Sequence, residues 1–332
     1  MNKRRIAVIA GGFSGESVIS RKSAITLMEH IDTTIFSPYL VILERNESSH
    51  ALSFSVEIQE KIVPIDLNTF SFEWEGEKIS FEYAYITIHG TPGEDGLLQG
   101  YLDIMGIPYN TGGVLCESIT FNKYICNTFL SGKNVLVAKS ILLRPSDFSM
   151  LKMHFSDFSF PVFVKPNKGG SSLATTKVLD FDALEPALNK VFAICPEAIV
   201  EEMIEGTEVT CGCIVLNHKK IMLPLTEVVV KGEDFFTWEA KYHGKSDEIT
   251  PARIDDVKAN EVKEITARVA DLLETKGIIR VDYIITPEGK PFLLEVNTTP
   301  GMTNESFIPQ QLRAAALPLK DVLTTVINEN LS

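Results

Sequence analysis

The first third of the chain alternates short apolar runs with stretches of helical spacing. The apolar runs, which predict strands, occupy residues 5–10, 39–43 and 83–88. Helical spacing is found at residues 16–30 and 95–105. The segment 70–81 alternates around Glu75 and Gly76, which predicts a β-hairpin. Strands that alternate with helices in this order are typical of an open α/β domain.

The rest of the chain mixes strands and helices without that alternation. Strands are predicted at 160–166, 198–203, 208–216, 278–285 and 292–296, and helices at 117–130 and 257–275. Residues 231–248 are polar and aromatic with no clean period, which is typical of a functional loop or of disorder. The pattern predicts a fold of α/β and α+β parts in several domains, with a cleft between domains.

Composition narrows the classes of function. The 332 residues include 31 basic and 44 acidic ones, a net charge of −13. So acidic a chain is a poor candidate for a general binder of nucleic acid or of anionic membranes. Any anionic substrate must be held by a few placed cations. No apolar stretch approaches the roughly 18 residues of a membrane span. The five cysteines follow no disulfide or zinc spacing, which favours reduced, buried thiols in the cytoplasm.

The last predicted hairpin carries polar groups among apolar neighbours. Arg280 and Asp282 are two residues apart and face the same side of one strand, as do Glu295 and Asn297 on the next. A four-residue turn would place Asp282 opposite Glu295 and Arg280 opposite Asn297. Two carboxylates and an amide oxygen on one patch favour an Mg²⁺ site, with the arginine at its edge holding a phosphate or an oxyanion. The alternative is a solvated polar face of an edge hairpin.

Two glycine-bearing turns are weaker signals. Lys165 ends a strand and is followed by a Gly-Gly-Ser-Ser loop at 169–172, a combination that can hold phosphates, although a plain turn is as good an interpretation. The turn 10–15 nearly matches the dinucleotide fingerprint, which keeps a nicotinamide enzyme as an alternative, but Ala10 replaces the first glycine. Taken singly, His89 is typical of a structural histidine, and Lys123 and Lys241 are typical of surface lysines.

In combination, the motifs resemble the D-alanine–D-alanine ligases of the ATP-grasp superfamily, from the first turn to about residue 312. The shared motifs, in family order, lie at 11–16 with Ser20, 89–100, 106–109, 164–166 with 170–172, 239–242, 280–282 and 294–303 with Ser306. The resemblance implies an open α/β domain at 1–112 and a two-part ATP-grasp fold. Its central subdomain would span 113–203 and its C-terminal subdomain 204–332, with a lid loop at 231–248.

The resemblance implies ligation of two D-alanines to D-alanyl-D-alanine through a D-alanyl phosphate, with ATP consumed, for peptidoglycan in the bacterial cell wall. Residues that would contact ATP are Lys123, Lys165, Glu201, Glu202, Met203, Ile204, Glu208, Lys241 and Asn297. Two Mg²⁺ ions, for which Mn²⁺ can substitute, would be bound by Asp282, Glu295 and Asn297; a K⁺ requirement stays open. The acyl phosphate needs protection from water, so a closing lid is expected.

The resemblance also assigns the substrate side. Residues placed there are Glu16 and His89 for the first D-alanine, Ser306 for the second, and Arg280 with the Gly301 N–H for the oxyanion. Ser171 and Tyr242 would bond with Glu16 to close the site. Related D-alanine–D-lactate ligases generally lack the loop tyrosine, so Tyr242 favours an amine as second nucleophile. A cytoplasmic homodimer that binds neither nucleic acid nor membranes is expected.

Some positions depart from the family motifs. Ser17 follows Glu16 where a basic residue is usual, and Thr111, Gly112 and Gly113 stand where the family has Gly-Ser-Gly. Two alternatives within ATP chemistry stay open: another ATP-grasp carboxylate–amine or depsipeptide ligase, with D-lactate or D-serine as second substrate, and a non-catalytic ATP-binding regulator.

Overall fold

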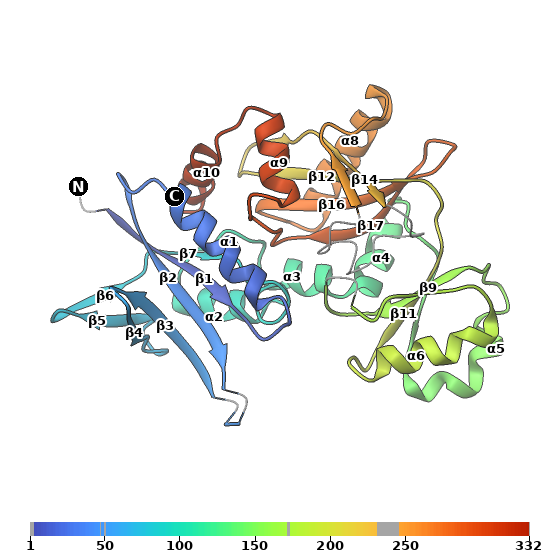
Figure 1. Ribbon diagram of the computed structural model, residues 1–332, viewed down its shortest axis with the longest axis horizontal. Coiled ribbons are helices and arrows are strands. Elements are labelled where there is room, and N and C mark those ends of the chain that lie inside the picture. The colour runs from blue at the N-terminus through green and yellow to red at the C-terminus, as the bar shows by residue number, and fades with distance from the viewer. Residues whose placement is uncertain (1–2, 47, 50, 171–172, 231–245, 332) are drawn as a thin grey trace.

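A computed structural model describes residues 3–46, 48–49, 51–170, 173–230 and 246–331 of the chain (Figure 1). Its first sheet has the strand order β4-β3-β2-β1-β7. The strands are β1 (Arg4–Gly11), β2 (Phe36–Arg45), β3 (Leu52–Ile58), β4 (Lys61–Pro64) and β7 (Tyr83–Ile86). β1 pairs in parallel with β2 and β7, and β1 and β7 are buried on both faces over most of their length, which is typical of parallel strands in an open α/β domain.

Helices and a hairpin cover this sheet. α1 (Ser17–His30) connects β1 to β2, and α2 (Leu97–Met105) follows β7. The hairpin predicted at 70–81 is confirmed as β5 (Ser71–Trp74) and β6 (Glu77–Ser80). Its aromatic side chains pack on the sheet in one cluster, in which Phe70 is fully buried. The rings of Phe72 and Tyr39 pack edge to face, with their centroids 5.6 Å apart. The hairpin therefore adds core to the first domain.

A four-stranded antiparallel sheet follows, in the order β10-β9-β11-β8. Its strands are β8 (Ser140–Leu143), β9 (Val162–Pro166), β10 (Thr176–Val178) and β11 (Ala198–Glu202). The helical segments beside it are η1 (Pro145–Met150), α5 (Leu151–His154), η2 (Phe181–Ala183) and α6 (Leu184–Phe192). α6 packs its apolar face on β9, so that one face of the sheet is covered and the other faces the rest of the molecule (Figure 1).

The third sheet is built around β12 and has the order β15-β14-β12-β16-β17, with β13 paired to β12. Its strands are β12 (Thr207–Val215), β13 (Lys220–Met222), β14 (Thr226–Val230), β15 (Ser246–Ile249), β16 (Gly277–Ile285) and β17 (Pro291–Asn297). α8 (Asp256–Leu272) packs against β12, whereas α9 (Phe307–Ala314) and α10 (Leu319–Leu331) share a core with α1 and β1. This shared core joins the first and third sheets.

The predicted pairing within the β16–β17 hairpin is confirmed, but the predicted turn is wrong. Arg280 lies opposite Asn297 and Asp282 opposite Glu295. The turn spans residues 286–290, one residue longer than predicted, and Ile285 pairs with Pro291. A register shift beside Asp282 absorbs the extra residue, so the polar side chains keep a common face.

Two further expectations need correction. The helix predicted at 117–130 is two helices, α3 (Val114–Phe121) and α4 (Lys123–Ser131), because Asn122 leaves the helical conformation and caps α4 by accepting from the Ile125 N–H at 3.0 Å. The last three residues of the loop predicted at 231–248 belong instead to β15, which begins at residue 246 and pairs with β14, whereas residues 231–245 lie outside the described residues. Within the described residues, no helix is long and apolar enough to cross a membrane. All five cysteines are buried and free.

Candidate active site

Two adjoining cavities lie where the three sheets meet. The first, which we call the inter-sheet cavity, has a volume of about 880 Å³ and lies between the β9–β11 sheet and the β12–β16 sheet. The second, the central cavity, has a volume of about 570 Å³ and is enclosed by α1, the loop after β7 and the segment after β17. Both are lined by Glu16, Lys123, Gly169, Gly170 and Glu295. A reaction between molecules in the two cavities would take place at these residues.

The inter-sheet cavity gathers most of the residues expected at ATP. Those that line it are Lys123, Lys165, Glu201, Glu202, Met203, Ile204 and Glu208. The Met203 N–H donates to the Pro161 carbonyl at 3.0 Å, so this donor is already used within the protein. Asn297, also expected at ATP, lines the central cavity. Lys241 lies outside the described residues.

Lys165 and Glu201 form a buried ion pair on neighbouring strands. Lys165 Nζ lies 2.7 Å from Glu201 Oε2, and Asn127 Nδ2 donates to Glu201 Oε1 at 2.9 Å. Burial lowers the pKa of Lys165, but the Glu201 carboxylate outweighs burial and leaves that pKa raised. Lys165 therefore keeps its positive charge at the wall of the inter-sheet cavity, where it can pair with a phosphate.

Lys123 is the first residue of α4 and points into the junction of the two cavities. Its Nζ lies 3.3 Å from Glu295 Oε1 and donates to the Gly169 carbonyl, and its side chain is only 12% exposed. The surface role that is typical of a lone lysine is therefore wrong. The position is set by the break at Asn122 and by Asn167, whose carbonyl accepts from the Lys123 N–H at 3.0 Å. Lys123 is thus a second cation, besides Lys165, that lines the inter-sheet cavity.

The Asp282 carboxylate accepts four hydrogen bonds from neighbouring side chains. Arg280 donates to both of its oxygens, Nε to Oδ1 and Nη2 to Oδ2, each at 2.9 Å. Thr210 Oγ1 donates to Oδ1 at 2.5 Å, and Asn297 Nδ2 donates to Oδ2 at 3.1 Å. Burial lowers the pKa of Arg280, but Asp282, Glu295 and Glu94 outweigh it and leave that pKa raised. The guanidinium is therefore a permanent cation at the cavity wall.

The donor set on the hairpin fits a hard divalent cation. Asp282 and Glu295 supply carboxylate oxygens and Asn297 an amide oxygen, on adjacent strands and on one face. Within the described residues, no group of three or more His, Cys, Asp and Glu side chains lies together in a way that could hold a metal ion. In this structure, arginine and lysine neutralise the two carboxylates, and a bound cation would take over part of that role.

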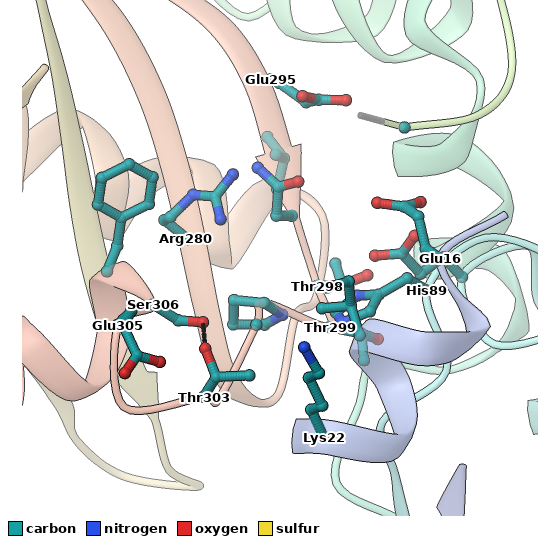
Figure 2. A pocket seen from close by; sticks show the side chains of 18 of the residues that line it. Glu16, Lys22, His89, Arg280, Glu295, Thr298, Thr299, Thr303, Glu305 and Ser306 are labelled. Carbon is teal, nitrogen blue, oxygen red and sulfur yellow. Dashed lines mark hydrogen bonds between the residues drawn. The ribbon is translucent and has the colours of Figure 1, made fainter. Parts of the chain in front are cut away.

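The central cavity brings together the residues expected at the substrates. Glu16 and His89 face Arg280, Ser306 and Thr303 across it (Figure 2). Ser306 Oγ lies 2.8 Å from Thr303 Oγ1, and a Cβ atom on Gly301 would come within 2.8 Å of Ser306 Oγ, so only glycine lets Ser306 approach this backbone. Burial lowers the pKa of His89, which favours its neutral form. Ser171 and Tyr242, expected to close the site, lie outside the described residues.

Three of the polar residues that line the central cavity without a role assigned on sequence grounds are close to the expected substrate residues. They are Lys22, Glu94 and Thr298. The sequence signal for Glu94 was its place in the His89 motif, four residues after Gly90, whose N–H donates to Glu94 Oε2 at 2.7 Å. Burial raises the pKa of Glu94 to about 8, with Glu16 and Glu295 adding to the shift against the Gly90 hydrogen bond. Glu94 is therefore largely protonated at neutral pH.

We expect Glu94 to make the ligand-free protein less stable as pH rises. The folded state keeps the Glu94 proton up to about pH 8, whereas the unfolded state releases it near pH 4.5, so stability falls between these values. Glu94→Gln keeps the hydrogen bond and removes the titration, so its melting temperature should fall less from pH 5 to pH 8 than that of the wild type. Thermal unfolding in several buffers checks this, with exposed Glu29→Gln as control; a Glu94→Gln curve parallel to the wild type would refute it.

Comparisons with known proteins agree with this geometry. Two family models match, "D-ala D-ala ligase N-terminus" over residues 5–112 and "D-ala D-ala ligase C-terminus" over residues 133–328. The chain is 51% identical over 333 residues to a D-alanine–D-alanine ligase of Porphyromonas gingivalis, a match that covers 100% of this chain and 99% of that protein.

Solved structures give the same result for the fold. The VanG D-Ala:D-Ser ligase from Enterococcus faecalis matches with a TM-score of 0.87 and 26% identity, over 99% of this chain and 100% of that one. A D-alanine–D-alanine ligase from Bacillus anthracis, solved in complex with ATP, matches with a TM-score of 0.77 and 26% identity, over 100% and 98% of the two chains.

The sheets on either side of the inter-sheet cavity, with the cations and carboxylates between them, define an ATP-grasp ligase. The fold class predicted from the sequence is confirmed. The chain belongs to the D-alanine–D-alanine ligase family.

Proposed function

We propose that this protein joins two molecules of D-alanine into D-alanyl-D-alanine, with ATP converted to ADP and phosphate, as a step in making peptidoglycan precursors. The observation that carries the proposal is the junction of the two cavities at Lys123 and Glu295, beside Asp282 and Arg280. A nucleotide in one cavity and an amino acid in the other would meet there. Membership of the ligase family supports the reaction.

We assign the inter-sheet cavity to ATP. Lys123 and Lys165 would hold its phosphates, because each is a largely buried cation that lines the cavity. The β11 edge with Glu201, Glu202, Met203 and Ile204 would contact the adenine, and Glu208 the ribose. Asn297 would act mainly through the metal, and Lys241 would reach the γ-phosphate from the segment that follows β14.

Asp282, Glu295 and Asn297 would bind Mg²⁺, or Mn²⁺ in its place. A bound divalent cation would neutralise charge on the phosphate oxygens during transfer. Arg280 would then turn part of its hydrogen-bonding capacity from Asp282 to the oxyanion. Whether the activity also depends on K⁺ is to be measured by assay with and without this ion.

The central cavity would hold both amino acids. The carboxylate of the first D-alanine attacks the γ-phosphate, and ADP leaves, which creates an acyl phosphate with a good leaving group. The amine of the second D-alanine then attacks the acyl carbon, and phosphate leaves. Glu16 would pair with the first ammonium, His89 would lie by its carboxylate and Ser306 would bind the second carboxylate, while Arg280 and the Gly301 N–H stabilise the tetrahedral oxyanion.

The remaining assignments follow the family. Ser171 and Tyr242 would close the site with Glu16, residues 231–248 would include the lid, and the three-part division at 112 and 203 would separate the domains. Membership of the family supports a cytoplasmic homodimer. A D-alanine–D-serine or D-alanine–D-lactate ligase is the alternative, and the likeness to VanG keeps D-serine as a second nucleophile to test.

The acyl phosphate intermediate is tested by following an oxygen atom from the D-alanine carboxylate into the released phosphate. D-alanine labelled with ¹⁸O in its carboxylate should give phosphate that carries one ¹⁸O atom, because a carboxylate oxygen stays on phosphorus when the amine displaces it. Mass spectrometry of the phosphate measures the label. Dipeptide formed together with unlabelled phosphate would exclude the acyl phosphate while leaving ligation intact.

A further inference from the structure

The backbone segment 297–302 forms one wall of the central cavity and is held at two points. At its far end, the Met302 N–H donates to Ser23 Oγ of α1 at 3.1 Å. Near its start, Thr298 Oγ1 donates to Glu117 Oε2 of α3 at 2.5 Å. Thr298 and Thr299 lie beside His89 (Figure 2), and both are almost fully buried. The wall is therefore fixed by side chains from two helices that precede it by about two hundred residues or more in the sequence.

Glu117 is an unusual residue for its surroundings. It is 0% exposed, and its carboxyl group makes no ion pair with a basic side chain in the described part of the chain. Burial raises the pKa of Glu117 well above its ordinary value, against the hydrogen bond from Thr298, which favours the uncharged form of the group. A buried acid without a cation is costly to keep, and a role in holding Thr298 accounts for its presence.

The sequence around Glu117 leaves space for this contact. Gly112 stands where the family motif has serine. A Cβ atom there would come within 2.5 Å of Cys116 Sγ and 3.1 Å of Glu117 Oε1. Any side chain at 112 would therefore displace the helix residues that reach toward Thr298. The glycine at position 112, where the family has serine, therefore leaves the space that the side chains of Cys116 and Glu117 occupy.

We propose that Glu117 is a positioning residue of the ligase reaction, which holds Thr298 and, through the backbone on either side of it, Asn297 and Gly301. This inference rests on the proposed function. Asn297 precedes Thr298 directly, and the Gly301 N–H follows three residues later. Because effective catalysis depends on reacting groups placed to within about 1 Å, loss of the contact lowers the rate of chemistry more than the binding of ATP.

The test compares side chains of similar size. Glu117→Leu fills the site without an acceptor, so its kcat should fall about thirtyfold while KM for ATP changes less than about threefold. Glu117→Gln retains an acceptor oxygen and should stay within about threefold of the wild type in kcat. Thr298→Val removes the donor and should match Glu117→Leu, and the double variant should lose no more than either single one. Ser118→Ala, which removes a hydrogen bond from the same helix to the Asp95 carbonyl, is the control.

Three results would overturn the proposal: a Glu117→Leu kcat within twofold of the wild type, losses that multiply in the double variant, or a Glu117→Gln enzyme as slow as Glu117→Leu. If Glu117→Leu does not fold, the kcat of Thr298→Val alone decides. Hydrogen exchange at the Thr299 and Gly301 amides, which should speed up in Thr298→Val, needs no turnover. It therefore separates failure of this proposal from failure of the proposed function.

Discussion

Asp282→Asn is expected to lower kcat about a thousandfold while the protein stays folded. The carboxylate has two tasks here: it fixes Arg280 through two hydrogen bonds, and it would supply a charged oxygen to the metal. Asparagine has nearly the same shape, so packing changes little, but its amide nitrogen faces a guanidinium that offers only donors. Both the metal site and the oxyanion site therefore lose their geometry together.

Steady-state kinetics across a range of Mg²⁺ concentrations, together with thermal unfolding, measure this effect. Asp271→Asn is the matched control, because it removes a carboxylate paired with Lys220 on the surface and should leave kcat near the wild type. An Asp282→Asn enzyme with more than a tenth of the wild-type kcat would remove Asp282 from the metal and oxyanion machinery.

The second large effect is expected at Lys165. Lys165→Met leaves Glu201 buried without its cation, which should cost about 3–5 kcal/mol of stability. It also removes a phosphate partner, so the Kd for ATP should rise about a hundredfold. In the double variant Lys165→Met/Glu201→Gln the buried charge is gone, so most of the stability should return while ATP binding stays weak.

Denaturant unfolding and calorimetric titration with ATP separate the two effects. Lys190→Met is the control for loss of a lysine near the same sheet, because Lys190 lies on the exposed face of α6. It should change neither the stability nor the Kd for ATP. Normal ATP affinity in the double variant would show that Lys165 serves the fold and not the nucleotide.

Much of the hairpin site could be predicted from the sequence, because side chains alternate between the two faces of a strand. This period of two placed Arg280 with Asp282, and Glu295 with Asn297, on a common face. The predicted pairing assumed a four-residue turn, and it holds only because a bulge beside Asp282 compensates for the longer turn. The bulge that restores the pairing after a longer turn was not predictable, because bulges depend on packing against neighbouring strands.

Other features of the site could not be predicted, because they depend on contacts between segments that are far apart in the sequence. Helical spacing continues across Asn122, so the break that points Lys123 into the cavity left no sign in the periodicity; its cause is the contact with Asn167, 45 residues later. The raised pKa of Glu94 comes from surroundings contributed by several segments. From the sequence, Glu117 is simply a polar residue on a predicted helix. Its buried hydrogen bond with Thr298 could not be predicted, because Thr298 lies 181 residues away in the sequence.

The central claim is tested most directly by phosphate release from Mg-ATP with D-alanine, beside L-alanine, D-serine and D-lactate, with the products identified by mass spectrometry. The account predicts phosphate release that depends on D-alanine and one D-alanyl-D-alanine for each phosphate. Phosphate release without dipeptide, or a product formed only with D-serine or D-lactate as second substrate, would contradict it.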